Sequence, residues 1–196
     1  MKRGLKAEAV LYAGIFLLLL PVCKGPTQTT PDATGTLTTT YQLSASQDSF
    51  VDVDGSRVVW LEDITGKYIK TLSVTEWVTD LGWTDQYKLR TVPDWNMKAD
   101  WGNAPKEEVD AVTIATPAAV GLDTVITQVG SLRIKPGTYY CCVEINITYI
   151  YNMMLKAPIK IGGVENQATS TTPIYTPSKH PTAGDILTDL QVKYSP

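Results

Sequence analysis

Short runs of β-branched and aromatic residues, separated by glycine, proline, aspartate and asparagine, recur along most of the chain, and helical periodicity is nearly absent. These runs predict eight strands, at residues 35–43, 57–62, 68–74, 109–116, 123–129, 138–149, 156–161 and 187–194. Many short strands with turns between them are typical of an all-β sandwich or barrel. We therefore expect an immunoglobulin-like β-sandwich of seven to eight antiparallel strands.

Turn-forming residues connect several of these strands. Asp63-Ile64-Thr65-Gly66 lies between two predicted strands and indicates a hairpin, in which Gly66 is free to adopt a positive φ. Lys135-Pro136-Gly137 precedes the longest run, where proline presets φ and glycine relieves the turn. Both connections favour antiparallel neighbours.

Two segments do not fit a minimal sandwich. Residues 76–108 hold four of the five tryptophans, and we expect a short helix near residues 75–81 or 106–109. Large aromatic side chains contribute much burial energy, so we expect this insertion to cover one end or face of the sandwich rather than to present a binding platform. Residues 162–184 are mostly polar, contain three prolines and predict a long surface loop.

The first residues have the form of a signal peptide, with basic residues followed by an apolar run over residues 9–20. This run is shorter than the roughly 20 residues that a membrane-spanning helix needs. Leu20-Pro21-Val22-Cys23 resembles a lipobox, which favours lipidation of Cys23 over ordinary cleavage at another bond. We expect a signal peptide over residues 1–23, a Thr/Pro-rich tether over 24–34, and the sandwich over 35–196. The domain would then lie in the periplasm or at a membrane surface.

The charge pattern bears on partners. Residues 1–23 carry three of the 17 basic and one of the 20 acidic residues, which leaves 14 basic and 19 acidic residues after export. No cluster of lysine and arginine is present, so the chain lacks the positive charge that neutralises phosphates and dominates affinity for nucleic acids. We expect no nucleic-acid partner.

Candidate catalytic groups are few. The chain has a single histidine, His180, in a proline-rich segment, and it lacks the usual motifs of metal, nucleophile and phosphate-binding sites. Asp52-Val53-Asp54-Gly55 resembles part of a calcium loop, but a solvated turn explains it better. We expect no enzyme and no metal site.

Cys141 and Cys142 are adjacent within a predicted strand. Neighbouring side chains of a strand point to opposite faces, so the two thiols are not expected to share one core or to bond easily. Two small half-buried residues are the favoured interpretation, and a vicinal disulfide is the alternative.

Several segments taken together resemble a known family. They are residues 58–63 with 66–72, 92–95, 109–117, 135–139 and 143–146. In combination they resemble the predicted periplasmic proteins catalogued as domain of unknown function 2271, over about residues 36–163. The resemblance implies an immunoglobulin-like sandwich similar to the C-terminal part of flagellar hook-capping proteins, with no established activity. Members commonly occur beside membrane PepSY proteins and the enzyme that attaches FMN to exported proteins, which implies a place in extracytoplasmic electron transfer.

The stretch from Val109 to Pro117 also resembles the acceptor motif for that flavin transfer. The resemblance aligns Asp110 with the acidic residue, Thr113 with the first hydroxyl residue and Thr116 with the flavin acceptor. Ile114 stands where the motif has glycine. The favoured alternative is a plain strand over residues 110–116, with no cofactor.

Three hypotheses follow. The leading one is a non-catalytic, lipid-anchored immunoglobulin-like domain that binds or supports a protein partner of the bacterial envelope. The alternative is an accessory protein of a flavin or electron-transfer system, carrying covalent FMN on Thr116. A third is carbohydrate binding by Trp83, Trp95 or Trp101. The sequence leaves the oligomeric state open.

Overall fold

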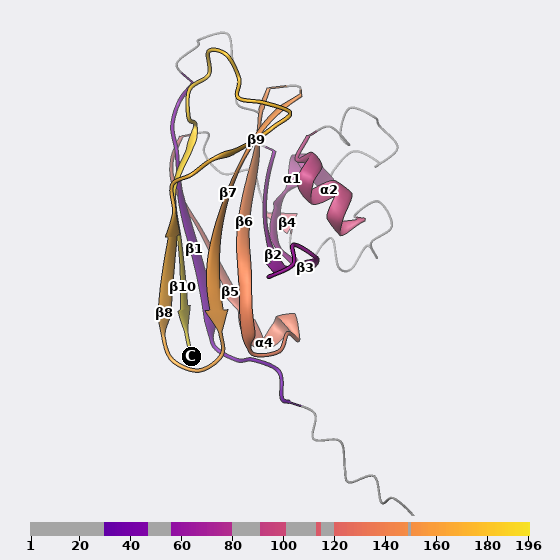
Figure 1. The fold of residues 1–196 in the computed structure, drawn as a ribbon, viewed down its shortest axis with the longest axis vertical. Helices are drawn as coiled ribbons and strands as arrows, with labels where there is room; N and C mark the ends of the chain where they lie inside the picture. The colour runs from indigo at the N-terminus through magenta and orange to yellow at the C-terminus, as the bar shows by residue number, and fades with distance from the viewer. Residues whose placement is uncertain (1–29, 47–55, 80–90, 101–112, 115–119, 149) are drawn as a thin grey trace, which may run out of the picture. The chain divides into compact units, whose positions relative to one another are not determined.

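A computed structural model describes residues 30–46, 56–79, 91–100, 113–114, 120–148 and 150–196. The described strands belong to one compact unit, Pro31–Pro196, and form two sheets (Figure 1). The four-stranded sheet has the order β5 (Gly121–Gln128), β1 (Thr36–Leu43), β10 (Leu187–Ser195), β8 (Asn166–Ser170). The other sheet has the order β4 (Thr113–Ile114), β3 (Tyr68–Thr75), β2 (Arg57–Asp63), β6 (Gly137–Thr148), β7 (Tyr151–Ile161), β9 (Ile174–Thr176).

All these pairs are antiparallel except the two-residue β4, which pairs parallel with β3 at one edge. The all-β sandwich predicted from the sequence is therefore confirmed. The described part holds ten strands rather than seven to eight. Of the predicted strand over residues 109–116, only residues 113–114 lie within the described ranges, and these form β4.

The prediction of a loop over residues 162–184 was wrong in part, because β8 and β9 lie within it. Only one face of β8 packs on the protein, and it pairs with β10 at the edge of its sheet, so a polar sequence is enough to build it. Strand β7 also begins earlier than predicted. The first residues of β7 are buried on both faces, so the sequence there does not alternate between polar and apolar residues.

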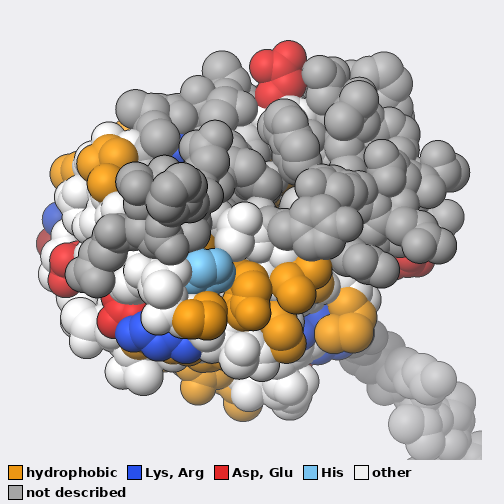
Figure 2. Space-filling view, turned by 90° about the horizontal axis from the view of Figure 1, so that it is seen from above, with side chains coloured by type: hydrophobic (Ala, Val, Ile, Leu, Met, Phe, Trp, Pro, Cys, Tyr) orange, Lys and Arg blue, Asp and Glu red, His pale blue; other side chains and the backbone are white. Residues whose placement is uncertain are grey.

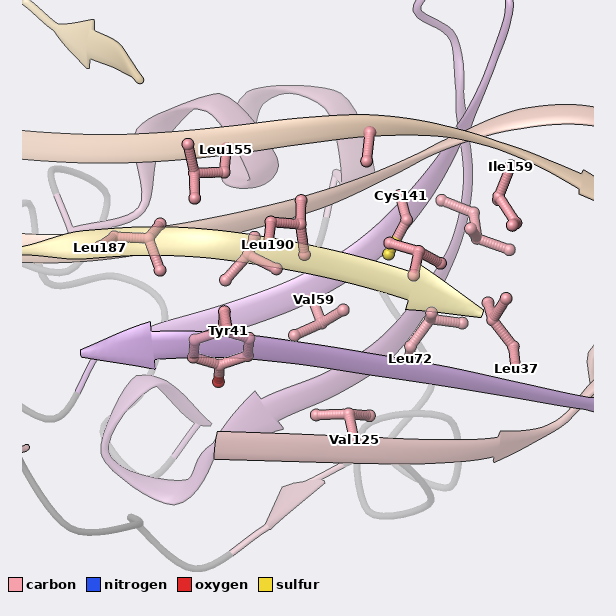
Figure 3. Packing of buried hydrophobic residues seen from close by; sticks show 14 of the residues in the cluster. Leu37, Tyr41, Val59, Leu72, Val125, Cys141, Leu155, Ile159, Leu187 and Leu190 are labelled. Atoms are coloured by element: carbon pink, nitrogen blue, oxygen red, sulfur yellow. The ribbon is translucent and has the colours of Figure 1, made fainter. Parts of the chain in front are cut away.

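Alternating side chains of the two sheets meet in the interior. Strand β1 alternates regularly between half-buried and buried positions, with Leu37, Tyr41 and Leu43 directed inward. Figure 3 shows Leu37 and Tyr41 packed between the sheets with Val59 of β2 and Cys141 of β6. This apolar layer is the main core, and its burial is the chief stabilising contribution.

A second apolar cluster lies on the outer face of the six-stranded sheet. Helices α1 (Glu76–Thr79) and α2 (Pro93–Ala99) lie on this side in Figure 1, away from β1, β8 and β10. Its buried members are Val58, Trp60, Val74, Val78, Val92, Trp95, Cys142 and Met154. The described part of the tryptophan-rich insertion thus covers a sheet face, as expected.

The prediction that the two cysteines are half-buried was wrong, whereas the prediction that they do not bond each other or share one core is confirmed. Cys141 is fully buried in the main core and Cys142 in the outer cluster, and both thiols are free. Their side chains do point to opposite faces of β6, as the strand geometry requires. Both faces are covered, because α2 closes the outer one; the sequence predicted a covering insertion but not that it lies over Cys142.

The remaining helix of the described part is the single turn α4 (Val129–Leu132), which lies between β5 and β6. Just before β1, the backbone amide of Ala33 donates to the carbonyl of Ile134, and Ala33 is buried. Within the described ranges, none of the helices has the length and apolar character needed to cross a membrane.

Candidate functional site

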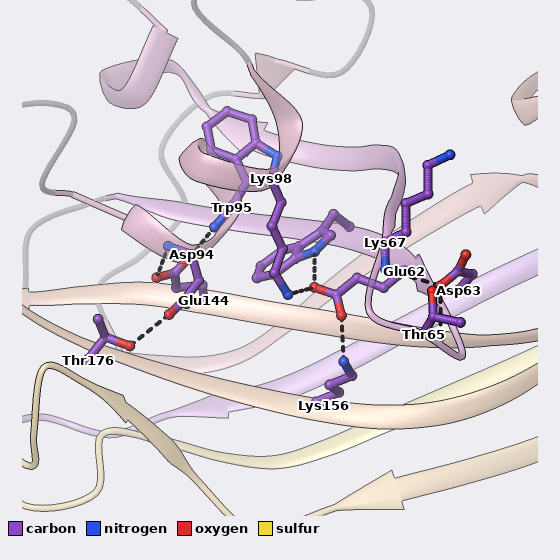
Figure 4. A network of polar contacts seen from close by, with 11 residues as sticks. Glu62, Asp63, Thr65, Lys67, Asp94, Trp95, Lys98, Glu144, Lys156 and Thr176 are labelled. Carbon is purple, nitrogen blue, oxygen red and sulfur yellow. Dashed lines mark hydrogen bonds and ion pairs between the residues drawn. The ribbon is translucent and has the colours of Figure 1, made fainter.

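A buried carboxylate organises the outer face of the six-stranded sheet. Glu62, on the face of β2 shared with Trp60, is fully buried. Its Oε1 accepts from Trp60 Nε1 at 3.1 Å and from Lys98 Nζ at 2.5 Å, and its Oε2 accepts from Lys156 Nζ at 2.5 Å (Figure 4). Burial alone would raise the pKa of Glu62, but hydrogen bonds from Lys156, Lys98 and Trp60 outweigh it and lower the pKa. The carboxylate is therefore ionised.

Helix α2 is held by a second buried carboxylate. Pro93 occupies the first turn, where its missing N–H costs nothing. Glu144 of β6 accepts from the backbone amides of Asp94 at 3.2 Å and Trp95 at 3.0 Å, which supplies acceptors that the helix lacks at its start. Burial raises the pKa of Glu144 to about 8, against the lowering effect of these amides. Trp95 Nε1 also donates to Thr71 Oγ1 at 2.9 Å.

The residue before the helix is strained. Val92 has a φ of 48°, which is costly for a β-branched residue, and its amide donates to Asn152 Oδ1 at 3.1 Å. Asn152 Oδ1 also accepts from Asn146 Nδ2 at 3.0 Å, so strands β6 and β7 fix this amide acceptor together. Helix α2 is thus attached to the sheet by side chains of strands that are distant in sequence.

An open groove lies beside Glu62, with a volume of about 480 Å³. Its lining comes from the β2–β3 turn, from β6 and β7, and from the β8–β9 segment: Ile64, Thr65, Gly66, Tyr140, Lys156, Ser170, Thr172 and Ile174. Lys156 Nζ lies 4.4 Å from the centre of the Tyr140 ring, a cation–π contact. A volume of this size falls in the range of ligand-binding clefts, about 300–1,000 Å³.

A smaller hollow of about 360 Å³ lies at α2 and β9, lined by Pro93, Asp94, Asn96, Met97 and Thr176. Thr176 Oγ1 donates to Asp94 Oδ2 at 2.7 Å across it. The charged group that lines this hollow is the acidic Asp94, whereas the groove has Lys156.

The single histidine, His180, does not line either hollow among the described residues. Figure 2 shows it beside a gathering of hydrophobic side chains. The His180 ring packs edge-on against Tyr151 at 4.7 Å, and its Nδ1 accepts from the backbone amide of Ala183 at 3.1 Å. These contacts give His180 a structural role in the loop between β9 and β10.

The residues singled out from the sequence fall mostly outside the described ranges. Cys23, Asp110 and Thr116 lie there, and so do Asp52 and Asp54. Thr113 lies in β4, where it pairs with Val74 of β3. The FMN hypothesis at Thr116 and lipidation of Cys23 therefore stay predictions.

Trp95 is fully buried, so it does not form the exposed platform that carbohydrate binding requires. The side chains of Trp77, Trp83 and Trp101 lie outside the described residues.

The described side chains offer little for catalysis. In the ranges that the structure covers, no group of three or more His, Cys, Asp or Glu residues is arranged to hold a metal ion. Burial raises the pKa of the Cys141 thiol to about 12, although a hydrogen bond with Thr39 opposes this, and burial also raises the pKa of Cys142. Neither thiol is a ready nucleophile.

The sequence did not single out Glu62, Lys98, Glu144 or Lys156 as candidate site residues. One signal was present. Strand β2 reads Arg-Val-Val-Trp-Leu-Glu-Asp, with large apolar residues at consecutive positions, which is typical of a strand buried on both faces. A charged residue in such a strand needs a buried partner.

A comparison with family descriptions matches residues 51–174 to DUF2271, described as a predicted periplasmic protein. No curated protein and no solved structure gives a significant match.

Proposed function

We propose a function for this chain from the premise that it belongs to the DUF2271 family of predicted periplasmic proteins. It is a non-catalytic β-sandwich that binds a protein partner in the bacterial envelope, and the groove beside Glu62 receives that partner. Cys23 carries the lipid that attaches the domain to a membrane.

The groove is the observation that carries this proposal. Three separate parts of the chain build its walls, namely the β2–β3 turn, strands β6 and β7, and the β8–β9 segment. Ile64 is 68% exposed and Ile174 is 43% exposed, so apolar side chains are presented to solvent at the groove. Exposed apolar groups together with hydroxyl-bearing walls are suited to contact with another chain.

The supporting structure under the groove is rigid. Tyr140 and Lys156 lie on long paired strands, and Lys156 is fixed from one side by Glu62. A binding surface on a stiff sheet loses little conformational entropy when a partner docks.

Photo-crosslinking in living cells tests the groove. A photoreactive amino acid at Thr65 or Thr172, on opposite walls, is compared with the same amino acid at Thr124, an exposed position of β5 in the other sheet. We expect both groove positions to yield one adduct of the same mass, identified by mass spectrometry, and Thr124 to yield none. Identical products from all three positions, or no product from the groove, would refute the proposal.

Metabolic labelling tests the anchor separately. We expect wild-type protein to incorporate a labelled fatty acid and the Cys23→Ala variant to incorporate none. An unlabelled, released wild-type product would show that the domain is a free periplasmic protein instead.

A further inference from the structure

We infer that the groove binds a carboxylate carried on an extended segment of the partner, and that the ammonium group of Lys156 pairs with it. This inference rests on the proposed function, in which the groove receives a protein partner. It adds the chemistry that the partner segment must have.

Charge balance at the floor of the groove gives the first argument. One carboxylate, Glu62, faces two ammonium groups, Lys98 and Lys156. The trio therefore keeps one positive charge that no carboxylate within it compensates. At the adjoining turn, Asp63 and Lys67 add opposite charges, and the Asp63 carboxylate accepts the Thr65 and Lys67 backbone amides of that turn. An acidic group entering the groove would complete the balance.

The position of Lys156 gives the second argument. Its ammonium is held between Glu62 Oε2 at 2.5 Å and the Tyr140 ring at 4.4 Å, yet the side chain remains 23% exposed and lines the groove. An ammonium has three donors, and Glu62 Oε2 accepts one of them. A lysine fixed in this way loses little freedom when it gains a further partner.

The walls indicate what carries the carboxylate. Ser170 and Thr172 supply hydroxyl groups that can bond to a peptide backbone, and Ile64 and Ile174 supply apolar contacts. The Thr65 hydroxyl donates to Asp63 Oδ1 at 2.6 Å and can still accept a bond from a backbone amide. Among the described residues that line this groove, Lys156 is the one cation, and none is an arginine. A phosphate group is usually bound by an arginine fork or several donors together, so one lysine suits a carboxylate flanked by apolar residues.

Peptide titrations test the inference on the mature full-length chain. The probe is the blocked pentapeptide Thr-Ile-Glu-Ile-Thr, and its matched partner has glutamine in place of glutamate. Binding is followed by calorimetry and by the backbone NMR signals of Tyr140 and Lys156. We expect the glutamate peptide to bind about tenfold more tightly, since a bond to a charged group has roughly this effect. We also expect this preference to shrink in about 1 M salt.

Two variants locate the effect. Lys156→Met keeps the aliphatic stem and leaves Glu62 paired with Lys98, and we expect it to bind both peptides equally. Lys160→Met is the control, because Lys160 lies on the same face of β7 but does not line the groove; it should keep the full preference.

The outcomes separate the two proposals. Equal binding of both peptides to the wild-type chain, with shifts at Tyr140, would refute the carboxylate and leave the groove as a binding site. Absence of binding by the glutamate peptide also refutes the inference, whereas the proposed function is decided by the crosslinks. The comparison of the two peptides on wild-type protein needs no variant to fold.

Discussion

Replacement of Glu62 by glutamine removes the charge at the centre of the outer polar network while keeping the shape of the side chain. Glu62 is fully buried and accepts hydrogen bonds from Lys98, Lys156 and Trp60. In the variant, the two ammonium groups face each other across a neutral amide. The amide oxygen can accept from one of them, and the amide nitrogen repels the other.

The expected loss follows from how far the lysines reach water. Removing one member of a fully buried ion pair costs about 3–5 kcal/mol, because the remaining charge is left uncompensated. Here Lys98 is 29% exposed and Lys156 is 23% exposed, so both are partly hydrated in the variant. We therefore expect Glu62→Gln to lower the free energy of unfolding by about 2–3 kcal/mol near neutral pH.

The pH dependence of this difference has a definite sign. The pKa of Glu62 is lowered in the folded state. Its contribution is therefore present above the pKa of the carboxyl group in the unfolded chain, and it is lost as the pH falls through the folded pKa. The difference between wild type and variant should shrink in acid.

Urea unfolding followed by tryptophan fluorescence and circular dichroism measures the effect. The control is Glu165→Gln, because Glu165 also binds a lysine, Lys193, at 3.1 Å, but in an exposed pair. An exposed pair is screened by solvent, so the control should change little. If Glu62→Gln were no more destabilising than Glu165→Gln, or if its effect were constant into acid, the account of the buried network would be wrong.

Three further predictions concern residues buried in the main core or on the outer face of the six-stranded sheet. Burial raises the pKa of Glu144 in the folded protein to about 8, from 4.5. The contribution of Glu144 to folding stability is therefore full below the pKa of the unfolded chain and is lost as the pH rises through the folded pKa. In urea melts across that pH range, the free energy of unfolding of the wild type should fall relative to that of Glu144→Gln by a few kcal/mol, of the order of 1.4 kcal/mol per pH unit. Cys141 and Cys142 are buried, so a thiol reagent should label neither in native protein and both after unfolding, and rapid labelling of either native thiol would contradict their burial. Trp95→Phe keeps most of the apolar burial but loses the bond to Thr71 Oγ1, and thermal melts should report a loss of about 1–2 kcal/mol; an unchanged melt would show that this bond contributes nothing.

Much of the architecture was predictable because it is encoded locally. Strand β1 alternates between inward and outward residues, and the Asp63–Gly66 turn carries its own hydrogen bonds, with Asp63 Oδ1 accepting from Thr65 and Lys67. A pattern of period two and a turn residue that needs a positive φ are visible in any single sequence. These features led directly to a sandwich.

The candidate site was much less predictable. Lys98 and Lys156 are 58 positions apart in the chain, yet both bind Glu62. Helix α2 is seven residues long and too short to display a periodic pattern. Its place on the sheet depends on Glu144 and Thr71, which lie on β6 and β3. No local pattern links these residues.

The sequence by itself determined the all-β class and most of the strands, because both depend on hydrophobicity and propensity within a few neighbouring residues. The tertiary structure decided that the six-stranded sheet is covered on both faces, that both cysteines are buried, and that an ionised Glu62 lies between two lysines beside a groove. The physical reason is that burial and charge pairing depend on which distant segments meet, and only the folded chain brings them together.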